Sequence, residues 1–181
     1  MGPRRRALKS ATEAAHGVLD GSLGPITDRA AYSNYLRVIT AFRSGVEGQL
    51  ARRLVNAPVS VLELSGDLIA DCQDLQVCAP PTSPFELGDR DEDVIGALYV
   101  LEGSALGARV LIGQAEALGF DAKFGARHLA KQADARDRWV EFQTFLETTE
   151  GLDIDALIAG ALKVFAFGRS VAESEFDAEA G

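Results

Sequence analysis

Residues 96–107 read Gly-Ala-Leu-Tyr-Val-Leu-Glu-Gly-Ser-Ala-Leu-Gly, inside an apolar segment with the periodicity of a helix. A glycine inside a helix costs roughly 1 kcal/mol relative to alanine, so three glycines in one helix need a reason. Gly103 and Gly107 are four residues apart and share one helical face with Tyr99. Missing side chains let another backbone or a flat molecule approach closely, and they also permit a kink. Taken alone, the glycine pair fits tight helix packing better than a ligand site.

The rest of the chain repeats the helical pattern, and strand-like alternation is nearly absent. We therefore expect an all-α fold in a single domain over residues 1–181, with about six main helices. Thr27 or Asp28 can cap the second helix, and a stiff proline-rich connector at 80–84 precedes the fourth. The ends at 1–4 and about 177–181 are expected to fray. The expected helices span residues 5–19, 27–54, 59–75, 91–118, 133–149 and 153–176.

The composition is that of a globular protein with an acidic surface, because the formal net charge is -9. Nucleic acids and anionic membranes need basic surfaces, so we expect neither as the main partner, although a local basic pocket for an anionic ligand stays compatible. The basic start at 1–6 precedes no apolar run and is not a secretory signal. Glu102, Arg109 and Glu116 interrupt the apolar stretch at 94–120, which favours a buried helix over a membrane span.

The two cysteines, Cys72 and Cys78, are too few for a disulfide framework, and their spacing matches no common metal pair. We expect both to be plain reduced thiols. Together with the missing secretory signal, this indicates a cytoplasmic protein.

His16 is the candidate metal ligand, although a lone helical histidine is more often structural. Asp20, four residues later, can accept a hydrogen bond from one ring nitrogen, which strengthens the other nitrogen as a ligand. Lys9, two turns earlier on the same face, can meet an anionic group of a bound ligand. Glu13 and His16 form the E-x-x-H element of di-iron bundles, but those sites need the element on two helices. His128, the second histidine, follows a glycine in a basic, alanine-rich stretch and is expected at the surface.

Two stretches together resemble the haem oxygenase family. Leu8-Lys9-x-Ala11-Thr12-x-x-x-His16 is similar to the opening of these enzymes, and residues 96–107 resemble the distal helix of their bacterial branch. Some members of that branch supply biliverdin to bacterial phytochromes. The resemblance covers nearly the whole chain. It implies a multihelical bundle that holds haem b between an N-terminal proximal helix and a glycine-kinked distal helix.

The resemblance assigns haem contacts residue by residue. His16 resembles the proximal iron ligand, which is sufficient because the porphyrin supplies the other four. Asp20 resembles the carboxylate that hydrogen-bonds the free ring nitrogen of that histidine. Lys9, Tyr99 and Arg169 resemble residues that contact the haem propionates.

Gly103 and Gly107 match the glycines that let the distal helix lie over haem. Between them, Ser104 stands where mammalian members carry an aspartate that organises water near bound oxygen. Ala105 stands where bacterial members often carry a polar residue. The three residues 103, 104 and 107 are thus the expected catalytic segment, with an altered distal water network.

The activity that the resemblance implies is oxidative cleavage of haem, which is both cofactor and substrate. O2 is the co-substrate, an external ferredoxin- or reductase-like donor supplies electrons, and the products are biliverdin, carbon monoxide and ferrous iron. Two other functions stay open. One is a non-catalytic haem binder or carrier on the same fold, favoured if Ser104 and Ala105 cannot order water. The other is a haem-free, thiaminase-like hydrolase, which needs a catalytic cysteine beside paired acids.

Overall fold

The computed structural model is built of α-helices joined by loops, and it describes residues 1–53, 60–81 and 84–179. The helices are α1 (Pro3–Leu23), α2 (Arg29–Leu50), α3 (Ser65–Leu75), α4 (Asp91–Gly103), α5 (Ala105–Ala117), α6 (Arg127–Asp134), α7 (Arg136–Thr148) and α8 (Ile154–Glu179). Within the described ranges, β-type pairing is limited to isolated bridges from Asp121 to residues 124 and 125. The predicted all-α fold is confirmed.

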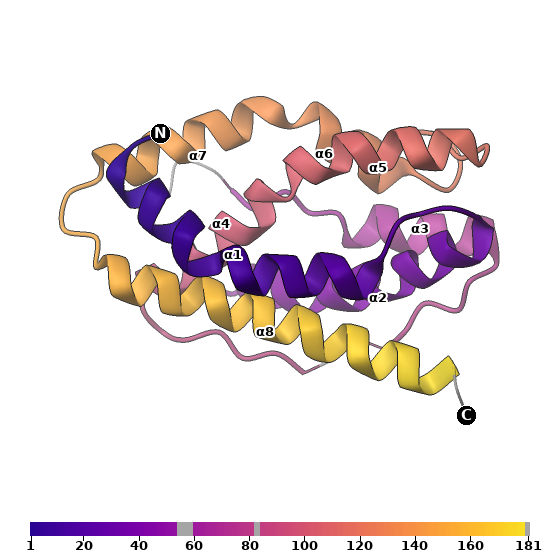
Figure 1. Cartoon of the computed structure of the whole chain (residues 1–181), viewed down its shortest axis with the longest axis horizontal. Helices are drawn as coiled ribbons and strands as arrows, with labels where there is room; N and C mark the ends of the chain where they lie inside the picture. The colour runs from indigo at the N-terminus through magenta and orange to yellow at the C-terminus, as the bar shows by residue number, and fades with distance from the viewer. Residues whose placement is uncertain (54–59, 82–83, 180–181) are drawn as a thin grey trace.

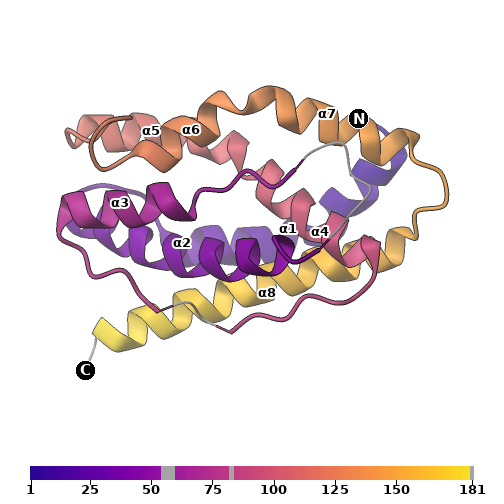
Figure 2. The same cartoon turned by 180° about the vertical axis from the view of Figure 1, so that it is seen from behind.

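The helices form two layers with α4 crossing between them (Figure 1). One layer holds α5, α6 and α7, and the other holds α1, α2 and α8, with α3 beside α2 in the view from behind (Figure 2). The closest packing partners are α4 with α8, α1 with α8, α5 with α6, and α2 with α3. This arrangement sets α1 opposite the junction of α4 and α5, although the two are far apart in sequence.

Local sequence explains where the first two helices end and begin. Gly24 caps the C-terminus of α1. Its φ is 65°, a positive value that glycine adopts readily, and its N–H donates to the carbonyl of Asp20. α2 begins after Asp28, whose side chain accepts the N–H of Ala31 at 2.9 Å. Asp28 is therefore the N-cap that the sequence predicted as one of two candidates.

Two of the predicted helices are divided in the structure. The helix expected at 91–118 is interrupted at Ser104, whose hydroxyl donates to the carbonyl of Leu101 at 2.6 Å and so competes with the regular ladder. A break at Ala135 also divides the helix expected at 133–149: residues 136–148 form α7, and residues 133–134 belong to α6, which begins at Arg127. The described chain thus contains eight helices in place of six.

The remaining boundaries differ by smaller amounts. The third helix begins at Ser65, because Glu47 accepts the N–H groups of Leu64 and Ser65 at 3.0 Å each and fixes its first turn. α1 begins at Pro3 and α8 continues through Glu179, so less of each end lies outside a helix than expected. The expected helix start at 59 and residues 82–83 of the connector lie outside the described residues.

One contact between α4 and α8 fixes how these helices cross. A Cβ on Gly96 would lie 2.5 Å from the carbonyl oxygen of Leu157 and 2.7 Å from the nitrogen of Ala161. A Cβ on Gly160 would lie 2.8 Å from Cα of Asp93. Since both positions meet backbone atoms, neither helix can retreat without moving as a whole. Of the three glycines at 96, 103 and 107, Gly96 is therefore the one that serves close helix packing.

We expect Gly96→Ala to destabilise the fold by roughly 1–3 kcal/mol, the usual cost of adding a methyl group to a filled contact. Gly17→Ala is the matched control, since a Cβ on Gly17 in α1 meets nothing within 4 Å. That change should stabilise the protein by up to about 1 kcal/mol through helix propensity. Urea unfolding followed by circular dichroism measures both values. A Gly96 variant as stable as the Gly17 variant would contradict the crossing described here.

By length and composition alone, Asp91–Ala117 could cross a membrane, but half of its most apolar window is buried inside the protein. Glu102 in this segment is buried and pairs with Arg138 of α7 at 2.8 Å. Such a segment is what the core of a helical bundle also contains, so it is weak evidence for a membrane protein.

Candidate functional site

A cavity of about 620 Å³ lies between α1 and the α4–α5 junction. Side chains from both hydrophobic clusters of the core line it. One cluster draws on α1, α2, α4, α7 and α8, and the other on α2, α3, α5 and α6. Of the predicted site residues, the cavity brings together Lys9, His16, Asp20, Tyr99, Gly103, Ser104 and Gly107. Arg169 is the predicted residue that does not line it.

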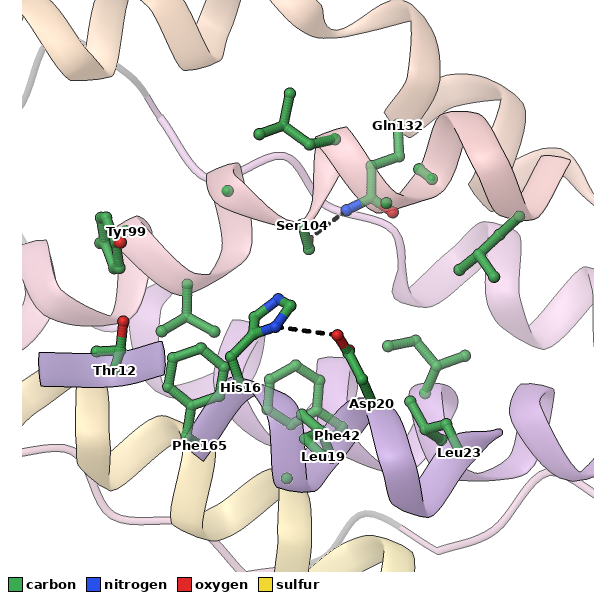
Figure 3. Close-up of a pocket in the computed structure, with 18 of the residues that line it drawn as sticks. Thr12, His16, Leu19, Asp20, Leu23, Phe42, Tyr99, Ser104, Gln132 and Phe165 are labelled. Atoms are coloured by element: carbon green, nitrogen blue, oxygen red, sulfur yellow. Dashed lines mark hydrogen bonds and ion pairs between the residues drawn. The ribbon is translucent and has the colours of Figure 1, made fainter. Parts of the chain in front are cut away.

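His16 enters the cavity from α1 (Figure 3). Its Nδ1 lies 3.0 Å from a carboxylate oxygen of Asp20, and its ring meets that of Phe165 edge-on with centroids 5.8 Å apart. The side chain is 60% exposed, so Asp20 and Phe165 contact the imidazole on one side and leave the rest of the ring accessible. With Nδ1 engaged by Asp20, Nε2 is the nitrogen left with a lone pair for a metal. The predicted pairing of these two side chains is present.

The cavity wall opposite His16 has no side chains at Gly103 and Gly107. A Cβ on Gly107 would meet nothing within 4 Å, and one on Gly103 would make only ordinary contact with Trp139 at 3.6 Å. Neither glycine is needed for helix packing, in contrast to Gly96. What the two glycines leave is free space over the cavity, at the break between α4 and α5.

Two cations from α1 reach the cavity. Lys9 and Arg5 are one turn apart and both line it, and Tyr99 lines it from α4. The sequence pointed to Lys9 but not to Arg5. Arg169 points elsewhere, since its Nε lies 3.4 Å from the carboxylate of Glu173 on its own helix. Its predicted contact with a ligand stays a prediction.

Polar groups do stand near the glycines, but they come from other helices. The side chain of Gln132 in α6 donates to the hydroxyl of Ser104 at 2.6 Å, and both residues line the cavity (Figure 3). Ala105 is buried, so a polar side chain there would face the core. The group that supplements Ser104 is therefore Gln132.

Arg43 in α2 is a cation buried at the cavity wall, with 2% of its surface exposed. Its Nε lies 2.9 Å from Glu47 and its Nη2 donates to the carbonyl of Leu62, whereas Nη1 has no hydrogen-bond partner among the described residues. Burial lowers the pKa of Arg43, and the carboxylates of Glu47 and Glu102 oppose that shift. An arginine stays charged even so. Arg43 is thus a cation buried in the cavity wall, with Nη1 left unpaired among the described residues.

The prediction that His128 lies at the surface is wrong. Its side chain is fully buried, and Asp71 of α3 accepts both its backbone N–H at 3.1 Å and its Nδ1 hydrogen at 2.7 Å. Burial lowers the pKa of His128 and outweighs the opposing effect of Asp71. Burial would raise the pKa of Asp71, but the hydrogen bonds from His128 and Arg127 hold it below its ordinary value. Tyr35, the neighbour of His128 on the other side, also lines the cavity.

No signal within single helices would have found Arg43, Gln132 or His128. Each is buried through packing against other helices; His128, for example, pairs with Asp71, which lies 57 positions earlier. A buried charge is a tertiary property, and a helical pattern with one arginine on it is common on surfaces.

No family model matches the chain. Among curated proteins, the haem oxygenase PigA of Pseudomonas aeruginosa is 44% identical over 59 residues, which are 32% of this chain and 30% of the relative. The sequence match thus spans less than a third of that relative's length. Among solved structures, the NO- and CO-bound haem oxygenase of Neisseria meningitidis matches with a TM-score of 0.78 and 26% identity. That match covers 96% of this chain and 92% of the other, so the fold is shared nearly end to end.

Proposed function

We propose that this chain is a haem oxygenase, which binds haem b in the cavity and cleaves it oxidatively, using O2 and electrons from an external donor. The products we propose are biliverdin, carbon monoxide and ferrous iron. The observation that carries the proposal is a single cavity with His16 on one wall and Gly103 and Gly107 on the other.

The cavity fits such a group in size and chemistry. Its volume of about 620 Å³ lies in the range of small-molecule and cofactor sites. Apolar side chains such as Phe42 and Phe165 can contact the faces of a flat ring, while Lys9 and Arg5 can meet its two carboxylates. Two local cations explain how a chain with a net charge of -9 can take up a dianion.

His16 would supply the iron ligand through Nε2. The carboxylate of Asp20 keeps the hydrogen on Nδ1, which fixes the tautomer and makes Nε2 a better donor. The edge of Phe165 against the ring restricts its rotation. When bound, haem supplies the redox-active iron at which O2 is reduced and activated.

The far wall would leave room for a small ligand and hydrogen-bond it. Gly103 and Gly107 provide the room, because side chains at these positions would project into it. Ser104 accepts from Gln132, so these two residues form a fixed polar pair beside the free space. Arg43, buried in the same wall, adds positive charge beside the cavity. Preorganised donors of this kind can hold water and stabilise negative charge that develops on bound oxygen.

Lys9 and Arg5 would set the orientation of the ring through its carboxylates, and Tyr99 would assist. We expect Lys9→Ala and Arg5→Ala each to weaken haem binding by roughly two- to fivefold, the effect of one partly exposed ion pair. Arg169→Ala should change affinity less, because Arg169 pairs with Glu173. Hemin titrations at low and high salt measure the three affinities, and the biliverdin isomers report orientation. A larger loss in the Arg169 variant would restore the propionate contact predicted for it.

The test of the proposed function is to add hemin to the protein, then ascorbate or a reductase under air, and to follow the visible spectrum. Appearance of the His-ligated haem spectrum, followed by its decay to biliverdin, is the expected result. A stable haem complex that never yields biliverdin would leave a haem binder or carrier, the alternative for which the apolar Ala105 argues. Failure to bind hemin would overturn both.

The thiaminase-like alternative has no support from the cavity. Cys72 is buried in the α2–α3–α5–α6 cluster, and Cys78 is exposed on the loop after α3. Neither thiol is among the residues that line the cavity. We therefore keep the haem-degrading function, with a ferredoxin- or reductase-like donor, a bacterial phytochrome as a candidate recipient of biliverdin, and the cytoplasm as the proposed location.

A further inference from the structure

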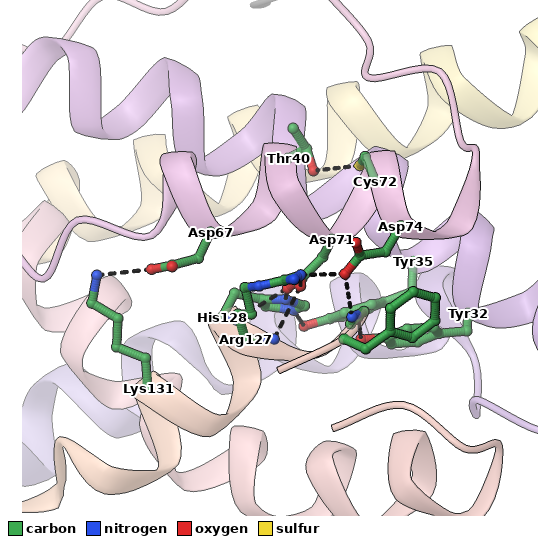
Figure 4. A network of polar contacts seen from close by, with 12 residues as sticks. Tyr32, Tyr35, Thr40, Asp67, Asp71, Cys72, Asp74, Arg127, His128 and Lys131 are labelled. Atoms are coloured by element: carbon green, nitrogen blue, oxygen red, sulfur yellow. Dashed lines mark hydrogen bonds and ion pairs between the residues drawn. The ribbon is translucent and has the colours of Figure 1, made fainter. Parts of the chain in front are cut away.

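The cavity wall contains a tyrosine with a built-in proton acceptor. Tyr35 lines the cavity, and its hydroxyl oxygen lies 3.4 Å from Nε2 of His128. Nδ1 of the same imidazole lies 2.7 Å from Asp71 (Figure 4). The two rings are stacked with centroids 5.8 Å apart. All three residues are buried, so the chain Tyr35–His128–Asp71 runs from the cavity into the protein without open solvent.

The direction of each hydrogen bond follows from the carboxylate. Ionised Asp71 only accepts, so Nδ1 of His128 must carry the hydrogen. Burial favours the neutral imidazole, whose other nitrogen then has only a lone pair. The hydroxyl of Tyr35 is therefore the donor and Nε2 the acceptor. A proton that leaves Tyr35 can form a bond at Nε2, and Asp71 stabilises the imidazolium that results.

We propose that Tyr35 is a redox-active residue that gives one electron to haem oxidised by hydrogen peroxide in the cavity and its proton to His128. In this step the O–H bond of Tyr35 breaks, an N–H bond forms at Nε2, and the oxidised haem is reduced by one electron. Tyr35 becomes a neutral phenoxyl radical, and His128 becomes an imidazolium. A one-electron reductant such as ascorbate restores the hydroxyl as the proton returns. The proposal rests on the proposed haem binding. It adds a path by which haem oxidised by peroxide is reduced by the protein, first by Tyr35 and then by an external reductant.

Neighbouring groups favour this step at Tyr35. Burial raises the pKa of Tyr35, so the hydroxyl does not release its proton to solvent at neutral pH. The neighbouring Nε2 of His128 is the base that can accept this proton. The other charged groups that act on the pair are Arg43 on the same helix and Asp67 on α3. Tyr32 stacks on Tyr35 with centroids 5.9 Å apart, but its hydroxyl donates to a backbone carbonyl, that of Gly125, which is no base.

A purely structural role is the competing explanation. Asp71 accepts the N–H groups of Arg127 and His128, the first two residues of α6, and would cap that helix without any tyrosine. Arg127 also pairs with Asp71 and Asp74, which ties α6 to α3. None of these contacts requires the hydroxyl of Tyr35. Removal of that hydroxyl therefore tests the redox role without breaking the contacts that tie α6 to α3.

The test uses haem-loaded protein mixed with hydrogen peroxide without reductant and frozen for EPR. Ring-deuterated tyrosine identifies a tyrosyl signal, and ENDOR in D2O detects the exchangeable deuteron that is bonded to Nε2 of His128 and hydrogen-bonded to the phenoxyl oxygen. We expect Tyr35→Phe to lower the tyrosyl signal at least roughly tenfold, whereas Tyr32→Phe leaves it unchanged. A tyrosyl signal of equal size in the Tyr35 variant would assign the radical to another tyrosine, such as Tyr99 in the cavity lining, and a signal that tyrosine deuteration does not change would assign it to Trp139; either result would overturn the proposal.

Two readouts keep this result apart from the proposed function. The haem absorption spectrum is recorded first, and its absence would refute haem binding, whereas a normal spectrum without a Tyr35-dependent radical refutes only the redox role. Nitrogen-15 NMR of the histidines tests the hydrogen-bond pattern in the haem-free protein. The expected tautomer of His128 carries hydrogen on Nδ1 alone, and hydrogen on Nε2 at neutral pH would overturn the proposal in the absence of haem.

Discussion

His16→Ala should lose the absorption spectrum of histidine-ligated haem and nearly all haem turnover. Among the residues that line the cavity, His16 is the only imidazole, and its free nitrogen has no substitute there. Loss of an outer partner of a metal ligand usually costs 10–100-fold in affinity or activity, so loss of the ligand itself should exceed roughly 100-fold. Hemin titration by absorption measures the affinity, and biliverdin formation measures turnover.

A graded series makes this result specific. Asp20→Asn keeps the ligand and weakens its support, and should cost roughly tenfold. Free imidazole added to His16→Ala should restore part of the spectrum, because the truncated side chain leaves a space on an exposed face of α1. The fold should be unaffected, since His16 is largely exposed. A His16→Ala protein with an unchanged spectrum would disprove the ligand assignment.

Gly107→Leu should block the cavity while leaving the helices intact. The new side chain enters free space, because a Cβ at this position meets nothing within 4 Å and the residue lines the cavity. A rigid ring that must share this space with four extra carbons pays an overpacking cost of roughly 1–3 kcal/mol, or about 5- to 150-fold in affinity. Helix propensity alone favours leucine over glycine by nearly 1 kcal/mol, so thermal stability should not fall.

Gly113→Leu is the matched control. Gly113 lies in the same helix, α5, a Cβ there also meets nothing within 4 Å, and the residue does not line the cavity. Both variants should gain thermal stability, and only the Gly107 variant should lose haem affinity or turnover. Equal affinity in the two proteins would show that the free space over Gly107 is not where the ligand lies.

Much of the fold could be predicted because local signals coincide with the structure. Asp28 caps α2 and Gly24 ends α1, each through contacts within a few residues. The break at Ser104 escaped prediction because a serine back-bond interrupts the ladder without disturbing the apolar period. The start of α3 depends on Glu47, which lies one helix earlier, so no pattern within residues 59–75 could locate it.

The candidate site divides in the same way. His16, Asp20 and Lys9 could be found because their spacing on one helix puts them on one face. Gln132 and Arg43 could not, because each reaches the cavity through the packing of separate helices. The predicted role of Arg169 depends on its side-chain direction, which sequence position does not give: the structure places it beside Glu173, and its contact with a ligand stays a prediction.

The cavity between α1 and the α4–α5 junction also couples the stability of the folded chain to any ligand that fills it. Atoms around a void lack contacts on one side, and Leu106 at its edge is 59% exposed. A ligand that binds only the folded chain adds about 2.7 kcal/mol of stability at one hundred times its Kd. With haem bound as proposed, the folded chain should therefore resist proteolysis better than the empty chain does.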